Sequence, residues 1–230
     1  FIYYINFSND SYNLGGSTFA QTQNKIGKET PTIKDAAKFK NAFNTIQNLI
    51  KEGRISAGHD ISAGGMLTTL LELCFSQDMV GANIDISNLG EADTIKVLFA
   101  ENSGIIFQST DKEVPNILKA NNVEFFDIGN AVRSENVTIT NNSKTVEFNV
   151  AELRDVWYET SYLLDNKQTA NGLAKKRFDV DLKQLSNEEQ TMCLMLHYDV
   201  WQSAGGFNSL EQSIKSIGKN NVLNDEIIEL

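Results

Sequence analysis

Hydrophobic positions along this chain change their spacing several times, and each change marks the edge of a predicted element. Residues 1–7 form an almost continuous apolar and aromatic run, which is typical of a β-strand. From about Lys34 to Glu52 the large apolar residues recur at helical spacing, and the segment stops at Gly53. The apolar side of this predicted helix consists of Phe39, Phe43, Ile46, Leu49 and Ile50.

Helical and strand-like segments then alternate as far as Asn149. The spacing predicts helices over residues 66–75 and 91–100, and Asp111 is placed to cap a third helix that carries Pro115 near its first turn. Strands are predicted over residues 82–86, 104–108, 123–128, 137–140 and 144–148, and the last two face each other across a turn at Asn141-Asn142-Ser143. This alternation favours a compact mixed α/β domain.

The chain changes character after Asn149. Residues 150–165 predict one helix, and its apolar side holds Leu153, Trp157, Tyr158, Leu163 and Leu164. Residues 166–178 are polar and locally basic, which indicates a linker or an extended arm. We therefore predict a domain over residues 1–149, a linker helix and arm over 150–182, and a tail of undefined fold over 183–230.

Charge and length narrow the classes of function. The chain has 230 residues, enough for a substantial core, and its 30 acidic and 20 basic residues give a net charge of −10. Such a surface repels nucleic acid and anionic membranes, and Lys175-Lys176-Arg177 is the main basic cluster. The sequence contains neither a run of about eighteen apolar residues nor a leader pattern, and Cys74 falls on the apolar side of a helix, as a reduced thiol would. We expect a cytoplasmic protein that binds neither nucleic acid nor membrane, and a chain cut from something longer.

A glycine-rich polar segment precedes the helix at residues 66–75 and carries the most informative chemistry. It reads Gly58-His59-Asp60-Ile61-Ser62-Ala63-Gly64-Gly65. Glycines let backbone N–H groups approach a ligand, a helix N-terminus carries about half a positive charge, and a carboxylate can hold a divalent cation. The segment favours a phosphate-bearing ligand with a metal. The competing interpretation is a capped turn whose glycines only allow close packing.

Three other positions leave a choice between ligand binding and packing. Gly15-Gly16, before a helix that starts at Ser17, could cradle a phosphate or simply form a tight strand-to-helix turn. His59 could orient Asp60 or pack as a neutral imidazole. Glu101 could reach a ligand across a domain interface, or be a solvated or helix-ending carboxylate.

Several segments, in one order, resemble a known family. They are Leu14–Ala20, the helix with Phe39 and Gln47, residues 59–75, and Leu98–Gly104. Together they resemble the C-terminal domain of the second, non-glutaminase half of the phosphoribosylformylglycinamidine synthases, in the superfamily of aminoimidazole ribonucleotide synthetase. Leu153–Thr160 resembles the helix that leads toward the glutaminase domain of that family, so the resemblance covers about residues 1–182.

The resemblance implies a fold and a reaction. The fold is α+β, a three-layer α/β sandwich with a mixed sheet, followed by a helical linker. Members are ligases of purine biosynthesis that use ATP to activate the amide oxygen of formylglycinamide ribonucleotide and displace the phosphate with ammonia from glutamine. That chemistry depends on positioning and charge neutralisation.

The resemblance also implies a site and partners. Asp60 helps to hold Mg²⁺, while Ser62, Gly64, Gly65, Gly15 and Gly16 line an auxiliary ATP or ADP site, and no residue of this chain is assigned a catalytic role. The companion synthetase and glutaminase domains of the same polypeptide are the implied partners. The first domain of this half supplies most of the magnesium ligands in the family.

The chain departs from the family in its tail. A glutaminase needs a Gly-x-Cys-x-Gly elbow and a downstream His-x-Glu, but Cys193 lies between Met192 and Leu194, and His197 precedes Tyr198-Asp199. This tail therefore cannot release ammonia, and the fragment alone is expected to be inactive. Two alternatives stay open: a nucleotide-binding scaffold without turnover, and a superfamily relative that acts on another substrate.

Overall fold

The computed structural model describes residues 1–76, 79–170 and 172–179. The chain divides into two units, residues 1–161 and 162–230, and each is described by itself. The predicted tail over residues 183–230, which includes Cys193, His197 and the Gly205-Gly206 pair, lies outside the described residues. The domain boundaries that we predict at residues 149 and 182 stay predictions.

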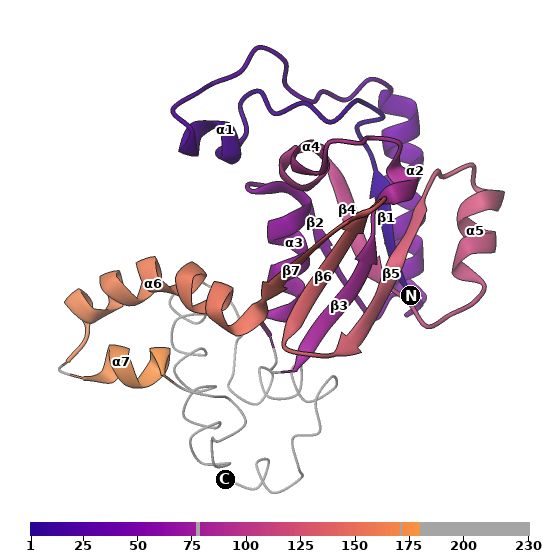
Figure 1. Cartoon of the computed structure of the whole chain (residues 1–230). Helices are drawn as coiled ribbons and strands as arrows, with labels where there is room; N and C mark the ends of the chain where they lie inside the picture. Colours follow the sequence, from indigo (N-terminus) through magenta and orange to yellow (C-terminus); the bar gives the residue numbers. More distant parts are fainter. Residues whose placement is uncertain (77–78, 171, 180–230) are drawn as a thin grey trace, which may run out of the picture. The chain divides into compact units, whose positions relative to one another are not determined.

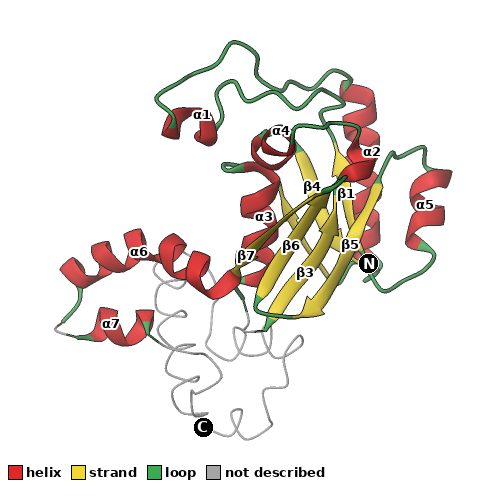
Figure 2. Cartoon of the chain, in the orientation of Figure 1, coloured by secondary structure: helices red, strands yellow, loops and turns green. Residues whose placement is uncertain are grey.

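Seven strands of the described residues form one mixed sheet in the first unit (Figures 1 and 2). Their order across the sheet is β2-β4-β1-β5-β3-β6-β7. Strands β3 and β6 pair in parallel, and the other neighbouring strands pair antiparallel. The strands are β1 (Ile2–Asn6), β2 (Ala57–Asp60), β3 (Val80–Asp85), β4 (Gly104–Gln108), β5 (Phe126–Arg133), β6 (Asn136–Asn141) and β7 (Lys144–Asn149).

Helices cover both faces of this sheet, which confirms the three-layer α+β fold (Figure 1). Successive side chains of a strand point to opposite faces, so Ile2 and Tyr4 of β1 join one core and Tyr3 and Ile5 join the other. The first core contains α3 and α4, and the second contains α2 and α5. The helices are α1 (Thr18–Thr22), α2 (Ala36–Lys51), α3 (Gly65–Cys74), η1 (Ser87–Leu89), α4 (Thr94–Phe99) and α5 (Val114–Ala120).

Short polar side chains determine where several of these helices begin. Asp35 caps α2 by accepting hydrogen bonds from two backbone N–H groups, and Asp93 caps α4 by accepting one, from Ile95. Asp111 is not itself the cap of α5, because the N-cap position falls on Glu113, two residues later, and the helix begins at Val114. Its carboxylate instead accepts a hydrogen bond from the Glu113 N–H and forms an ion pair with Arg54.

The strand boundaries differ from expectation at β5. This strand begins at Phe126 rather than Val123 and continues to Arg133. Gly129 has φ +140°, and the pairing register with β1 shifts there, so the strand passes through a bulge that interrupts its hydrophobic pattern. The hairpin between β6 and β7 is confirmed, with Asn142 in the left-handed conformation at its turn.

The expected apolar side of α2 is only partly buried. Ile46 and Leu49 lie in the core as predicted, but Phe43 and Ile50 remain 45% and 47% exposed. Ala42 and Thr45 take the adjacent buried positions. Helical periodicity alone gives the apolar stripe, whereas the neighbouring strands decide which part of it is covered.

Two helices follow β7 among the described residues. Helix α6 (Val150–Gln168) begins as predicted but continues beyond Asp165, and α7 (Leu173–Phe178) replaces the extended arm that we expected over residues 166–178. Within the second unit, the Tyr162 and Phe178 rings lie 4.7 Å apart and Arg177 pairs with Asp165, and these contacts hold α7 as a helix. None of the described helices is both long and apolar enough to cross a membrane.

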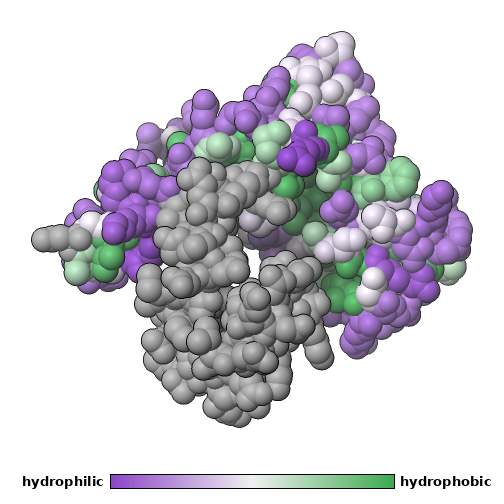
Figure 3. Space-filling view, turned by 90° about the horizontal axis from the view of Figure 1, so that it is seen from below, coloured by the Kyte–Doolittle hydropathy of each residue, from purple (hydrophilic) through white to green (hydrophobic). Residues whose placement is uncertain are grey.

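The surface of the described residues is mostly hydrophilic, with hydrophobic side chains exposed in places (Figure 3). In α6, Trp157 is 48% exposed, and Leu163 and Leu164 are exposed as well, so the expected apolar side of this helix is largely uncovered among the described residues.

Candidate functional site

Asp60 lies where the edge strand β2 ends, one short turn before α3. Its main chain is fixed, because its carbonyl oxygen accepts a hydrogen bond from the Thr69 hydroxyl at 3.1 Å and the next residue, Ile61, is buried. Its carboxylate, in contrast, is 77% exposed. A rigid backbone with an exposed carboxylate is the arrangement that a metal ligand from this position requires.

Ser62 occupies the outer side of the same turn. Among the described residues, its exposed hydroxyl has no hydrogen-bond partner. Gly65, in contrast, donates its N–H to the Ser62 carbonyl at 3.0 Å, which closes the turn. The Ser62 side chain is therefore available to a ligand, whereas its carbonyl is already used.

Gly64 and Gly65 are required by the local geometry even without a ligand. Both have positive φ, +86° and +70°. A Cβ on Gly64 would lie 2.1 Å from the Thr68 hydroxyl oxygen, and one on Gly65 would lie 2.6 Å from the Leu98 carbonyl oxygen. The packing interpretation therefore accounts for both glycines, and their predicted role in nucleotide binding stays a prediction.

Gly15 and Gly16 form a closed turn. Their N–H groups donate to the carbonyls of Glu29 and Ile26, at 2.8 Å and 2.6 Å, and a Cβ on Gly15 would lie 2.2 Å from the Glu29 carbonyl oxygen. Ser17 follows as the N-cap of α1. The tight-turn interpretation explains this pair, since both amides are already bonded within the chain, and the predicted contact with a phosphate is untested.

Glu101 joins the start of α1, which follows the Gly15-Gly16 turn, to the turn at Gly64. One of its carboxylate oxygens accepts hydrogen bonds from the Thr18 N–H at 2.8 Å and from the Gly64 N–H at 2.9 Å. Glu101 follows α4 in sequence but is only half-buried and bonds to the starts of two other helices, so its role is not limited to ending α4. No local pattern predicts this role, because its partners are 83 and 37 residues away in sequence.

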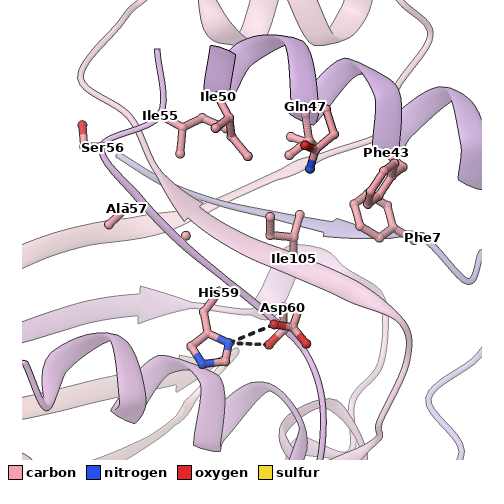
Figure 4. A pocket seen from close by; sticks show the side chains of 12 residues that line it. Phe7, Phe43, Gln47, Ile50, Ile55, Ser56, Ala57, His59, Asp60 and Ile105 are labelled. Carbon is pink, nitrogen blue, oxygen red and sulfur yellow. Dashed lines mark hydrogen bonds and ion pairs between the residues drawn. The ribbon is translucent and has the colours of Figure 1, made fainter. Parts of the chain in front are cut away.

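The His59 imidazole lies against Asp60 on one side (Figure 4) and against Glu72 on the other. Its Nδ1 lies 2.8 Å from the Asp60 carbonyl oxygen and 3.5 Å from a carboxylate oxygen of Asp60, and its Nε2 lies 3.2 Å from a Glu72 carboxylate oxygen. His59 thus both packs and contacts Asp60, which combines the two alternatives given by the sequence. Glu72, on α3, is a residue that the sequence did not single out.

An apolar groove of about 650 Å³ runs between α2 and the β2 edge (Figure 4). Phe43 and Ile50 of α2 line it, together with Phe7, Ile55 and Ile105, and Asp60 lies at one end. The groove explains why the two α2 side chains stay exposed. Its volume falls in the range of small-molecule sites, although apolar grooves of this kind also receive neighbouring domains.

The side chains available as metal ligands limit which metal ion the described residues can hold. Within residues 1–76, 79–170 and 172–179, no group of three or more His, Cys, Asp or Glu side chains lies close enough to hold a metal ion. Mg²⁺ takes about six oxygen ligands, of which one or two are commonly carboxylates and several are water or phosphate. Asp60 therefore fits as one carboxylate of a site completed by nucleotide, water and residues from elsewhere.

The fold and the turn together define the class of protein: a three-layer α/β domain with a polar, glycine-rich turn between an edge strand and a helix. The chain belongs to the family described as AIR synthase related protein, C-terminal domain, which matches residues 8–141. This membership confirms the superfamily resemblance seen in the sequence motifs.

Curated relatives carry the name of one enzyme. A protein of Arabidopsis thaliana, named probable phosphoribosylformylglycinamidine synthase, chloroplastic/mitochondrial, is 33% identical over 173 residues, which are 72% of this chain and 12% of the relative. The human phosphoribosylformylglycinamidine synthase is 31% identical over 172 residues, 72% of this chain and 13% of the relative. The chain thus spans about one eighth of the length of these relatives.

A solved structure supports the fold. PurL of T. maritima, complexed with FGAR, superimposes with a TM-score of 0.52 at 16% sequence identity, covering 66% of this chain and 27% of that chain. At this identity the likeness concerns the fold alone.

Proposed function

We propose that this chain is the part of a phosphoribosylformylglycinamidine synthase that contributes an auxiliary Mg²⁺-nucleotide site. The whole enzyme would convert formylglycinamide ribonucleotide, glutamine and ATP to formylglycinamidine ribonucleotide in purine biosynthesis. The observation that carries the proposal is the exposed Asp60 carboxylate on a fixed main chain, beside the exposed side chain of Ser62. The names of the curated relatives support the choice of enzyme.

Each residue of the turn has a distinct role in this proposal. Asp60 is a ligand of Mg²⁺, and the ion, when bound, neutralises phosphate oxygens of ATP or ADP. Ser62 donates its hydroxyl to the nucleotide. Gly64 and Gly65, like Gly15 and Gly16, shape the turns that bring the main chain close to it.

The partners follow from the length of the relatives. Because the chain spans about one eighth of them, we propose that companion synthetase and glutaminase domains of the same polypeptide complete the enzyme in the cytoplasm. The half-exposed Phe43 and Ile50 in the groove beside β2 support a contact with such a domain. No role for nucleic acid or membranes is proposed.

A scaffold without turnover is the second candidate function. It is favoured because the described residues hold no group of three or more His, Cys, Asp or Glu side chains that could form a metal centre. In that case the nucleotide stabilises the domain by binding only the folded state.

Calorimetry of Mg²⁺-ADP binding to the protein with its companion domains tests the site. Asp60→Asn should weaken binding about tenfold, or about 1.4 kcal/mol, while Glu159→Gln, which removes an equal charge from an exposed position on α6, should leave it unchanged. Equal affinities for wild type and Asp60→Asn would remove Asp60 from the site. Consumption of ATP that depends on formylglycinamide ribonucleotide identifies the enzyme, whereas a stable ADP complex without hydrolysis identifies the scaffold.

A further inference from the structure

Glu101 connects two parts of the domain that are distant in sequence. It is half-buried in the loop between α4 and β4, and a single carboxylate oxygen accepts from the Thr18 and Gly64 N–H groups at 2.8 Å and 2.9 Å. Thr18 is the first residue of α1 and Gly64 is the N-cap of α3. The side chain therefore joins the starts of two helices through one atom.

The surroundings of Glu101 hold its main chain in place. The next residue, Asn102, is buried and donates to the Ser8 hydroxyl at 2.9 Å and to two main-chain carbonyls of the same N-terminal segment. On the other side, Phe99 stacks on Phe19 of α1, with ring centroids 4.6 Å apart. The carboxylate is thus positioned before any ligand arrives, so little conformational entropy is lost in keeping it there.

The charge of Glu101 suits the atoms that it contacts. Main-chain N–H groups in the first turn of a helix lack partners within the helix, and a carboxylate there is stabilising. Hydrogen bonds to an ionised acceptor are about twice as strong as neutral ones. The Gly64 N–H already donates to Glu101, so it is not available to a phosphate bound at this turn. Such a phosphate would be bound through Asp60 and Ser62 instead.

We propose that Glu101 is a positioning residue that clasps the start of α1, which follows the Gly15-Gly16 turn, to the Asp60–Gly65 turn, and that it withholds the Gly64 N–H from the ligand. The clasp itself is a property of the folded chain. Its consequence, that Ser62 and Asp60 are presented in a fixed position to a nucleotide, rests on the proposed function.

Hydrogen–deuterium exchange, followed by mass spectrometry without nucleotide, tests the clasp. Two conservative variants separate reach from charge: Glu101→Gln keeps an acceptor oxygen at the same length, and Glu101→Asp keeps the charge but is one methylene shorter. Exchange should rise about tenfold in Glu101→Asp and Glu101→Ala, in the peptides over residues 14–22 and 61–70 together. Glu101→Gln keeps the reach but loses the charge, so exchange should rise by a smaller factor, about threefold. Glu159→Ala should change neither peptide.

The result that overturns the clasp is unchanged exchange in both Glu101→Asp and Glu101→Ala, or a change in only one of the two peptides. A general loss of folding would also raise exchange over β6 and β7, so those strands serve as the internal control. If Glu101→Ala does not fold, Glu101→Asp and Glu101→Gln still decide between the outcomes.

Affinity for Mg²⁺-ADP then tests the consequence of the clasp. Glu101→Asp should bind about five- to tenfold more weakly than wild type, while Glu101→Gln should bind within about twofold of it. If Glu101→Asp and wild type bind Mg²⁺-ADP with equal affinity, the clasp does not hold Ser62 and Asp60 in position for the nucleotide. Wild-type protein that shows the exchange pattern but binds no nucleotide would refute the proposed function and leave the clasp standing.

Discussion

Glu72 of α3 and His59 of β2 face each other across 3.2 Å, measured from carboxylate oxygen to Nε2. The other carboxylate oxygen of Glu72 accepts a hydrogen bond from Trp157 Nε1 of α6 at 3.1 Å. Glu72 therefore links the residue beside Asp60 to the helix that follows the sheet, and one partly buried carboxylate serves both partners.

This relationship predicts energetic coupling among the three side chains. Glu72→Ala should lower the free energy of unfolding by about 1–2 kcal/mol, because it removes the hydrogen-bond acceptor of Trp157 and the carboxylate that faces His59. Urea unfolding of Glu72→Ala, Trp157→Phe and the double variant should give a coupling energy of about 0.5–1 kcal/mol. The pair Glu72→Ala and Asp111→Ala, which share no partner among the described residues, should instead be additive. Additivity in the first cycle would show that the Trp157 hydrogen bond contributes nothing to stability.

Gly65→Ala should destabilise the domain by more than the cost of placing an alanine at a positive φ. The new Cβ would lie 2.6 Å from the Leu98 carbonyl oxygen, so α3 and α4 would have to separate. Gly53→Ala is the matched control, since Gly53 has φ +68°, close to the +70° of Gly65, and no described heavy atom within 4 Å. We expect a loss of about 1 kcal/mol at Gly53 and about 2–4 kcal/mol at Gly65 in chemical denaturation. Equal losses would contradict the steric argument.

Cys74 should be unreactive in the folded protein. Burial raises the pKa of its thiol to about 11, so at pH 8 only about one molecule in a thousand carries the thiolate that alkylating reagents attack. In a Cys193→Ser background, iodoacetamide should label Cys74 at least about a hundredfold more slowly in native buffer than in urea. Rapid native labelling would mean that α3 opens often enough to expose the thiol.

Asp10 should contribute stability that is lost in acid. The backbone N–H of Thr32, 3.0 Å from a carboxylate oxygen, is the main cause that lowers the pKa of Asp10, and Lys34 lies 3.2 Å away. A carboxyl group whose pKa is lower in the folded state stabilises the fold above its unfolded pKa of about 3.9, and the contribution disappears as the pH falls through the folded value. Asp10→Asn should therefore be about 1 kcal/mol less stable at pH 7, with the difference shrinking below about pH 4. A difference that stays constant between pH 7 and pH 3 would assign the loss to packing.

Much of the fold could be predicted because it depends on local spacing. The apolar run of β1, the helical repeat of α2 and the β6–β7 hairpin each lie within one short segment, and each was confirmed. Where a bulge at Gly129 broke the alternation, the prediction of β5 failed at both ends. The helical state of α7 depends on contacts of Tyr162 and Asp165 with residues twelve or more positions later, which a local pattern does not contain.

The sequence by itself determined the family and the candidate turn, because the motif from His59 to Gly65 is continuous and its residue types carry their own chemistry. Only the tertiary structure decided how that turn is held. Glu101 reaches Thr18 and Gly64 through folding alone, and the exposure of Phe43 beside Asp60 depends on which strand forms the sheet edge. Contacts between residues far apart in the chain depend on how whole helices and strands pack. They therefore cannot be predicted from the residue spacing within one segment.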